Sequence, residues 1–251
     1  MIYLYHYKNY SLLYLSLSIR KILVFAGGVN KGVENVKTKW MLILNDDIEF
    51  EEVHKVYKVR KVHKEEKTIE KLIQFAEKNN LDAVSPILRN PDGEVENYGY
   101  RLLPMGKIEL VKENPKSEIR NPKQIIYTND KNSKRFENLY LENSKIVSNL
   151  EFRASNLNID GITAACLLVR TEVFKKLGGF DESFFAYLED VDFFLRLATL
   201  AQDRSFGIAY DVEVLHNHMT TTKTMGNFKA RQDMINWWRL FFNHPKKFKF
   251  D

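Results

Sequence analysis

Three carboxylates stand within four residues at the start of an apolar segment. Glu189, Asp190 and Asp192 lie in the stretch 184–201, where an aromatic run precedes them and a strongly apolar run follows. This pattern predicts a helix with an acidic first turn, because unpaired N–H groups and the positive end of the helix dipole favour ionised acids there. A carboxylate kept ionised beside a cleft can act as a general base. The simpler interpretation is structural, with the acids only capping the helix.

Two further polar clusters follow apolar segments. They are Asn45, Asp46 and Asp47 after the segment 40–44, and His216 and His218 at the end of 206–218. In α/β sheets, ligands bind beyond the C-terminal ends of strands. Acids and a histidine brought together there could bind a divalent cation, since Mg²⁺ prefers oxygen ligands. Taken singly, an Asp-Asp pair is more often a turn, and a strand-end histidine is more often a surface or hydrogen-bonded residue.

Composition limits the class of protein. The chain has 251 residues, of which 44% are hydrophobic and 28% charged, with a net charge of +5. The positive charge suits a nucleotide, a nucleic acid or an acidic membrane surface. Cys166 is the only cysteine, so the sequence excludes an intramolecular disulfide and favours a reducing cytoplasm. No apolar run is long enough to span a bilayer, and no P-loop or G-x-S-x-G motif occurs.

The elements that must position these clusters alternate along the chain, which predicts an α/β fold. Strands are expected within 40–50, 82–100, 161–170 and 206–218, with a turn at 90–93. Helices are expected at 68–78, 171–177, 189–201 and 228–248, and Thr68 and Thr171 are expected to cap the first two. Residues 25–36 are expected to form a glycine-rich turn that leads into a short helix. Residues 51–67 indicate a linker or an irregular helix, and residues 104–158 a long polar excursion with at most short elements.

The last expected helix carries four aromatic residues: Trp237, Trp238, Phe241 and Phe242. We expect these side chains to lie in the core, because an aromatic stripe at helical spacing is usually buried. The alternative is peripheral contact with a membrane, since Arg and Lys flank the aromatic residues.

Several segments, met in this order, resemble family-2 glycosyltransferases. FAGGVNKGVENVKTKWMLILNDDIEF is similar to the middle of their nucleotide-sugar domain, and VSPILRNPDGEVENYG to the strand–turn–strand that follows in the rhamnosyltransferase-like branch. ITAACLLVRTEVFKKLGGFDESFFAYLEDVDFFLRL resembles that branch almost position by position, and VEVLHNH resembles its closing strand and histidine. The resemblance covers about 22–50, 82–100 and 159–220.

The resemblance implies a GT-A fold, with a mixed, mostly parallel sheet and flanking helices. It also implies inverting transfer from a nucleotide diphosphate sugar to a hydroxyl of a glycan or lipid-linked saccharide. Asp190 would be the general base and Glu189 would orient the site, while Asp192 stays structural. The implied ligands of Mg²⁺ or Mn²⁺ are Asp47 and His216, and the implied donor-side residues are Gly28, Asn30, Gly32 and Asn45.

One part of the family pattern is missing. The family begins with a strand, a helix and a second strand that hold the base and the ribose, and nothing before Phe25 matches them. We therefore expect one domain over 1–251, shortened at its N-terminus. Its parts would be a partial nucleotide-sugar region at 22–100, the excursion at 104–158 and an acceptor and catalytic region at 159–251.

Two functions follow from this resemblance. One is metal-dependent inverting glycosyl transfer in the cytoplasm, with the inner membrane face as a further location. The other is an inactive, truncated remnant that acts at most as an interaction module. A nucleic-acid partner is not expected, because the chain has the charge but no recognised motif or basic helix face.

Overall fold

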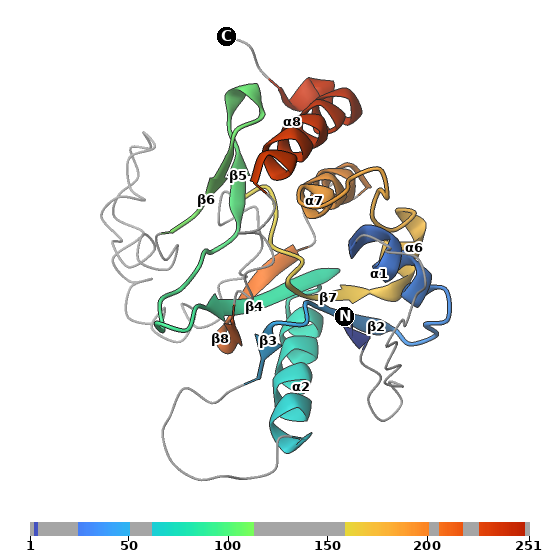
Figure 1. Cartoon of the computed structure of the whole chain (residues 1–251). Coiled ribbons are helices and arrows are strands. Elements are labelled where there is room, and N and C mark those ends of the chain that lie inside the picture. The colour runs from blue at the N-terminus through green and yellow to red at the C-terminus, as the bar shows by residue number, and fades with distance from the viewer. Residues whose placement is uncertain are drawn as a thin grey trace, which may run out of the picture.

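The protein is described from a computed structural model (Figure 1), which covers residues 3–4, 25–50, 62–112, 159–200, 206–217 and 226–248. The described strands are β1 (Tyr3–Leu4), β2 (Trp40–Leu44), β3 (Ile48–Glu49), β4 (Ala83–Arg89), β5 (Tyr100–Leu102), β6 (Ile108–Leu110), β7 (Cys166–Arg170) and β8 (Phe206–His216). The described α-helices are α1 (Phe25–Val33), α2 (Val62–Lys78), α6 (Thr171–Lys176), α7 (Glu189–Leu200) and α8 (Gly226–Asn243). Short 3₁₀ turns cover Pro104–Gly106 and Pro245–Lys247.

The main sheet has the strand order β1-β2-β7-β4-β8-β3. Of the pairings within the described residues, β4–β8 is parallel, and β1–β2, β2–β7, β4–β7 and β3–β8 are antiparallel. The expected α/β class is confirmed, but the sheet is mixed rather than mostly parallel. The cause is β7, which lies between β2 and β4 and runs against both of them.

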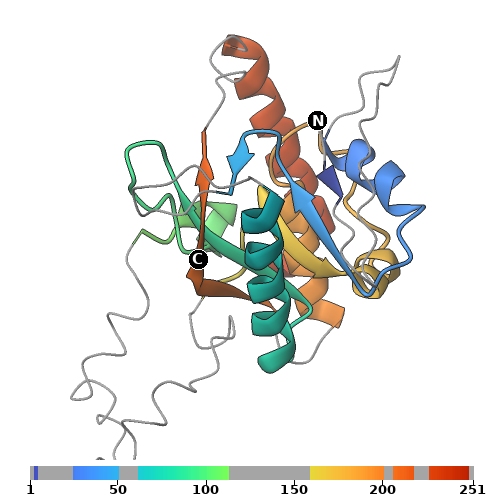
Figure 2. The same cartoon turned by 90° about the horizontal axis from the view of Figure 1, so that it is seen from below.

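Helices cover both faces of the sheet. Figures 1 and 2 show α2 on one face, and α1, α6, α7 and α8 on the other. The strand β2 shows how the core is divided. Trp40, Leu42 and Leu44 pack in the cluster that includes α2, while Met41 and Ile43 pack in the cluster that includes α1, α6 and α7. The five consecutive apolar residues of β2 thus reflect a strand buried on both faces.

The boundaries of two helices differ from those expected. The helix expected from Thr68 begins six residues earlier, at Val62, because no helix-breaking residue separates the two positions. Its end at Lys78 is confirmed, and Asn80, two residues later, takes a left-handed φ of 49°. Thr171 is the first residue of α6 and makes no capping hydrogen bond through its side chain, so the capping prediction is wrong.

For residues 25–36 the predicted short helix is found as α1, but the predicted glycine-rich turn is wrong, because the helix begins at Phe25 and includes the glycines. Gly28 and Gly32 lie buried inside this helix, and Asn30 lies between them. The Asn30 side chain donates to the carbonyl oxygen of Phe180 (2.8 Å) and accepts from the Phe180 N–H (2.9 Å). Asn30 therefore fastens α1 to the loop after α6. The paired glycines of that loop, Gly178-Gly179, end α6 with φ values of 80° and 77°, as expected.

The remaining elements complete the fold around one end of the sheet. The turn Asn90–Gly93 follows β4 as predicted, with the Gly93 N–H donating to the Asn90 carbonyl oxygen. Strands β5 and β6 form a separate two-stranded sheet, and the described start of the polar excursion, up to residue 112, holds only short elements, as expected. The rest of that expectation, residues 113–158, lies outside the described residues, as does His218. No helix in the described ranges is long and apolar enough to cross a membrane.

Leu72 gives a direct test of this layered core. Its side chain is fully buried between α2 and the sheet, whereas the neighbouring Lys71 is exposed. We expect Leu72→Ala to lower the free energy of unfolding by about 2–5 kcal/mol, because it leaves a cavity under α2. Lys71→Ala should change it by less than about 0.5 kcal/mol. Urea denaturation measures both, and equal effects would contradict the packing of α2.

Candidate functional site

Apart from His218, the polar clusters found in the sequence lie along one rim of the sheet. The C-terminal ends of β2, β4 and β8 and the N-terminal end of β7 lie along this rim, as the strand pairings require. Two hydrogen bonds connect the clusters across it. The Asn45 N–H donates to the Ala165 carbonyl oxygen (2.9 Å), and the Ala164 N–H donates to Asp190 Oδ2 (3.3 Å). Ala164 and Ala165, the two residues before β7, therefore link the segment after β2 to the acidic first turn of α7.

The first cluster places a histidine between two carboxylates. His216 Nε2 lies 3.2 Å from Asp47 Oδ1, and His216 Nδ1 lies 2.9 Å from Glu96 Oε1. Pairing of β3 with β8 creates this contact, because it places Ile48 opposite His216 and lets the Asn217 N–H donate to the Asp47 carbonyl oxygen. The expected proximity of Asp47 and His216 is therefore found.

The electrostatics of this cluster favour a positive charge. Burial by itself would lower the pKa of His216. The hydrogen bond and the charge of Glu96, together with the charge of Asp47, outweigh burial and raise that pKa above its usual value. All three side chains are largely buried. A cation held here, whether a proton on the ring or a metal beside it, is shielded from water by the surrounding protein.

Glu96 was missed by the sequence analysis. It follows the Asn90–Gly93 turn, and its N–H donates to the Leu88 carbonyl oxygen (3.0 Å), which returns the chain to the end of β4. Nothing in the local sequence distinguishes Glu96 from the neighbouring Glu94, which is exposed.

The second cluster is the acidic first turn of α7. Glu189 is 8% exposed, and its Oε2 atom has no hydrogen-bond partner within the described part of the chain. Burial, with the adjacent charge of Asp190, raises the pKa of Glu189 to about 8. Burial also raises the pKa of Asp190, although the N–H groups of Ala164 and Val191 donate to its carboxylate and oppose the shift.

These directions correct the expectation from the helix dipole. The dipole favours ionised acids at a helix N-terminus, but its contribution is typically a fraction of a kcal/mol to about 1 kcal/mol. Removing a carboxylate from water costs more than this when no cation compensates it. Burial is therefore the dominant influence on the pKa values of Glu189 and Asp190, and both residues retain protons at higher pH than ordinary acids do.

The backbone that delivers these acids is strained. Tyr187 and Leu188, directly before α7, have φ values of 66° and 68°, in the left-handed region that non-glycine residues rarely adopt. Each such residue costs about 1–3 kcal/mol. The strain is held by Asn236 of α8, which is completely buried and whose amide donates to the Ala186 and Tyr187 carbonyl oxygens. Strain of this kind gathers at functional sites.

Tyr100 supports the same turn from the opposite side. Its buried hydroxyl donates to the Asp190 carbonyl oxygen (3.3 Å), and its ring lies against Gly161. A Cβ atom at Gly161 would stand 2.0 Å from the Tyr100 hydroxyl oxygen, so only glycine fits there. Burial and the charge of Asp190 raise the pKa of Tyr100, which keeps the hydroxyl protonated as a donor. Sequence reasoning missed this residue, because the contact joins segments 90 residues apart.

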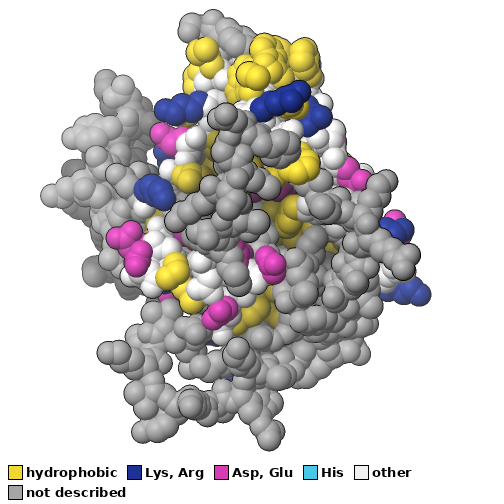
Figure 3. All heavy atoms as spheres, in the orientation of Figure 1, with side chains coloured by type: hydrophobic (Ala, Val, Ile, Leu, Met, Phe, Trp, Pro, Cys, Tyr) yellow, Lys and Arg dark blue, Asp and Glu magenta, His cyan; other side chains and the backbone are white. Residues whose placement is uncertain are grey.

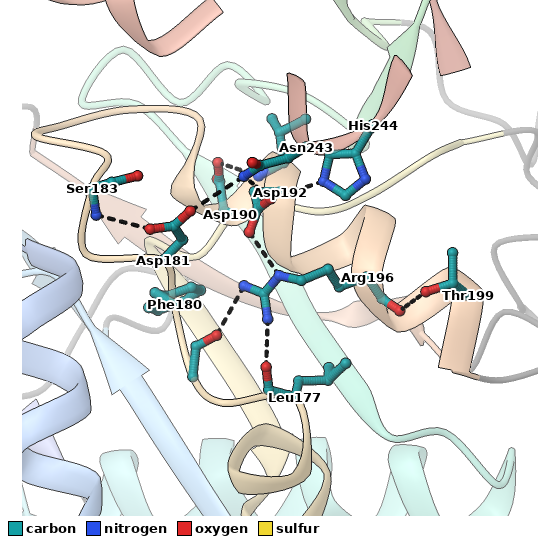
Figure 4. Close-up of polar contacts among 12 residues, drawn as sticks. Leu177, Phe180, Asp181, Ser183, Asp190, Asp192, Arg196, Thr199, Asn243 and His244 are labelled. Carbon is teal, nitrogen blue, oxygen red and sulfur yellow. Dashed lines mark hydrogen bonds and ion pairs between the residues drawn. The ribbon is translucent and has the colours of Figure 1, made fainter. Parts of the chain in front are cut away.

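Asp192 has a structural role, as expected. Figure 4 shows its carboxylate between Arg196 Nε (2.7 Å) and His244 Nε2 (2.8 Å), with Asn243 donating as well. Burial alone would raise the pKa of Asp192, but these partners lower it. Arg196 also donates to the carbonyl oxygens of Leu177 and Gly179, so the network joins α7, the loop after α6 and the end of α8. A polar pocket of about 360 Å³ lies over this network.

The side chains of the other expected site residues are not found in either cluster. The Asn45 N–H donates to the Ala165 carbonyl oxygen. The Asn30 side-chain nitrogen donates to the Phe180 carbonyl oxygen and to the Glu182 carboxylate, and its side-chain oxygen accepts from the Phe180 N–H. Gly28 and Gly32 are buried in α1 instead of forming a loop. Their donor-binding role stays a prediction without support from this arrangement.

Asp47 and His216 form a pair rather than a complete metal centre. Within the described residues, no group of three or more His, Cys, Asp or Glu side chains is arranged to hold a metal ion. In comparisons with known proteins, no family model matches this chain, and no curated protein matches it either.

The raised pKa of Glu189 gives a pH-dependent stability. Between about pH 4.5 and 8, the folded chain retains a proton that the unfolded chain releases, so this residue reduces stability as the pH rises through that window. Glu189→Gln cannot ionise and should gain stability over the native protein as the pH rises. We expect the gain to be larger at pH 8 than at pH 5 by at least about 1.4 kcal/mol, the equivalent of one pKa unit.

Urea denaturation at both pH values measures this difference. Glu172→Gln is the matched control, because Glu172 stands in the first turn of α6 but is exposed. A gain that is the same at pH 5 and pH 8 would show that Glu189 ionises like an ordinary acid.

Proposed function

We propose that this protein catalyses metal-dependent, inverting transfer of a sugar from a nucleotide diphosphate donor to an acceptor hydroxyl on a glycan or lipid-linked saccharide. One observation supports the proposal above all others. The buried Glu189–Asp190 pair and the Asp47–His216 pair reach the same rim of the sheet and are linked through Asn45, Ala165 and Ala164. The reaction needs both functions at one place: a base for the acceptor and a cation for the departing diphosphate.

The residues of the first cluster fit a divalent cation. Two neighbouring ligands at about 2.1 Å from an octahedral ion are about 3.0 Å apart. The observed 3.2 Å between Asp47 Oδ1 and His216 Nε2 is close to that spacing. Glu96 contacts the other ring nitrogen, as carboxylates commonly do behind a metal-binding histidine. The donor's diphosphate oxygens would complete the shell, and carboxylate with imidazole suits Mn²⁺ or Mg²⁺.

A bound cation would supply stabilisation of the charge that develops on the leaving diphosphate. Contacts within the protein fix the positions of the residues that would hold the cation. Asp47 is held by the Asn217 N–H on its carbonyl oxygen, and the His216 ring is fixed by Glu96. In this arrangement, the negative charge of two carboxylates is available to a dication without further movement of the strands.

Asp190 is the proposed general base. The acceptor oxygen forms a bond to the anomeric carbon, the bond from that carbon to the diphosphate oxygen breaks, and the acceptor proton passes to Asp190. The N–H groups of Ala164 and Val191 hold the carboxylate in place. Its raised pKa strengthens it as a base near neutral pH. Glu189 is a positioning residue that retains a proton near neutral pH, while Asp190 accepts the two backbone N–H groups that favour an ionised carboxylate.

The proposal includes a cytoplasmic location. Nucleotide sugar donors and an unpaired cysteine both suit that compartment. Cys166 is fully buried in the sheet, and burial raises the pKa of its thiol, so it takes no part in the proposed chemistry.

Cation and nucleotide binding can be tested without knowing the sugar. We expect UDP or dTDP to bind in the presence of Mn²⁺ and to lose measurable binding with EDTA or in Asp47→Ala. Glu96→Gln should weaken the Mn²⁺-dependent binding about 10–100-fold, because the histidine loses the group that orients it. Isothermal titration calorimetry measures each affinity. The matched control is Asp92→Ala, which removes an exposed acid from the turn before Glu96.

Transfer itself depends on Asp190. With a donor identified from a panel of nucleotide sugars, Asp190→Asn should reduce turnover by about 10²–10⁴-fold and leave the affinity for Mn²⁺ and nucleotide unchanged. Asp211→Asn, an exposed acid on β8, should retain full turnover. Release of the nucleoside diphosphate provides the assay. Unchanged turnover in Asp190→Asn would remove the proposed base. An absence of nucleotide binding in the native protein would instead favour an interaction module without catalysis.

A further inference from the structure

Helix α8 has two faces of different character. Asn236 and Leu240 are completely buried against the body of the protein. On the other side of the helix, Met234, Trp238 and Phe242 are 59%, 49% and 71% exposed. Their spacing of four residues aligns them in one stripe along the helix. The sequence analysis expected the aromatic residues of this helix in the core, and for Trp238 and Phe242 that expectation is wrong.

The exposed stripe is a continuous apolar surface. The rings of Trp238 and Phe242 stack with their centres 5.9 Å apart, and Trp237 and Phe241 join them from the side. Figure 3 shows this surface as a hydrophobic area over α8, with Lys or Arg side chains at its border. Contiguous exposed aromatic surface of this kind marks a site of association with a protein or a membrane.

The charged residues of α8 and the 3₁₀ turn after it are mostly basic. Between residues 226 and 248 the chain carries five basic residues and one acid: Lys229, Arg231, Arg239, Lys246 and Lys247 against Asp233. Asp233 and Arg239 are both half-buried, and each lies about 100° around the helix from its neighbour in the stripe, Met234 or Trp238. Arg231, Lys246 and Lys247 are exposed; Arg231 precedes Met234 by three residues on the same side of the helix, and the two lysines lie in the 3₁₀ turn that follows α8.

We propose that this face of α8 docks onto an anionic lipid bilayer. An amphipathic helix with Trp, Phe and Met on one side and Arg and Lys around them lies in the plane of the membrane interface. There the apolar side chains enter the acyl boundary and the cations meet anionic headgroups. The charge distinguishes this occupant from a second copy of the chain, since a twofold contact would bring the same cations together.

Docking by this face would orient the rest of the molecule. The buried side of α8 holds the strained loop before Glu189 through Asn236. The stripe lies on the far side of the same helix, about 10–12 Å away across its diameter. A membrane bound at the stripe would therefore lie one helix away from the acidic turn of α7.

Vesicle flotation with the intact chain tests the docking. We expect binding to vesicles of phosphatidylcholine with 30% phosphatidylglycerol, and at least about tenfold weaker binding to phosphatidylcholine alone. Trp238→Ser with Phe242→Ser should weaken binding to the anionic vesicles by at least tenfold. Lys246→Glu with Lys247→Glu should remove the preference for anionic lipid. The control, Met105→Ser with Leu110→Ser, removes exposed apolar side chains elsewhere and should bind like the native protein.

Circular dichroism and thermal unfolding establish that each variant folds, since the exchanged side chains are all exposed. Native-like flotation of the Trp238→Ser, Phe242→Ser variant would overturn the proposal. So would a native dimer, seen by light scattering, that this variant converts to a monomer, because the face would then belong to a second copy. Neither result depends on nucleotide binding or sugar transfer.

Discussion

The carboxyl group of Glu189 is removed from water at the rim of the sheet, and one of its oxygens has no partner among the described residues. An ionised acid in that position would be costly, so the first turn of α7 retains a proton to about pH 8. Asp190 shares the burial but receives two backbone N–H groups, which favour its ionised form over that of its neighbour. This difference between the two carboxyl groups allows Asp190 to act as the proton acceptor.

The rest of the fold holds that turn in place. Tyr187 and Leu188 are strained, and they remain so because Asn236 binds the loop from α8 while Arg196 and Asp192 bind α7 to the loop after α6. Burial of apolar side chains on both faces of the sheet supplies the free energy that keeps these strained residues in place. Helix α8 therefore serves two purposes: its inner side supports the site, and its outer side presents an apolar surface.

The sequence predicted the parts that depend on local patterns. Apolar runs identified β2 and β8, and the acidic turn with its apolar continuation identified α7. It did not predict features set by contacts between distant segments. The glycines of α1 suggested a turn, although packing makes them helical. The reversed direction of β7, the approach of Glu96 to His216 and the exposure of Phe242 likewise depend on tertiary structure, which a local pattern does not contain.

We propose that a cation at Asp47 and His216 lies beside the acidic turn of α7. NMR of the protein with ¹³C-labelled glutamate carboxyl groups tests it, by comparing Mn²⁺ with Mg²⁺ in the presence of UDP. The account predicts that Mn²⁺ broadens the signals of Glu96 and Glu189 and spares Glu77, which binds Trp40 at the opposite rim of the sheet. Sharp signals from both Glu96 and Glu189 in the presence of Mn²⁺ would contradict it.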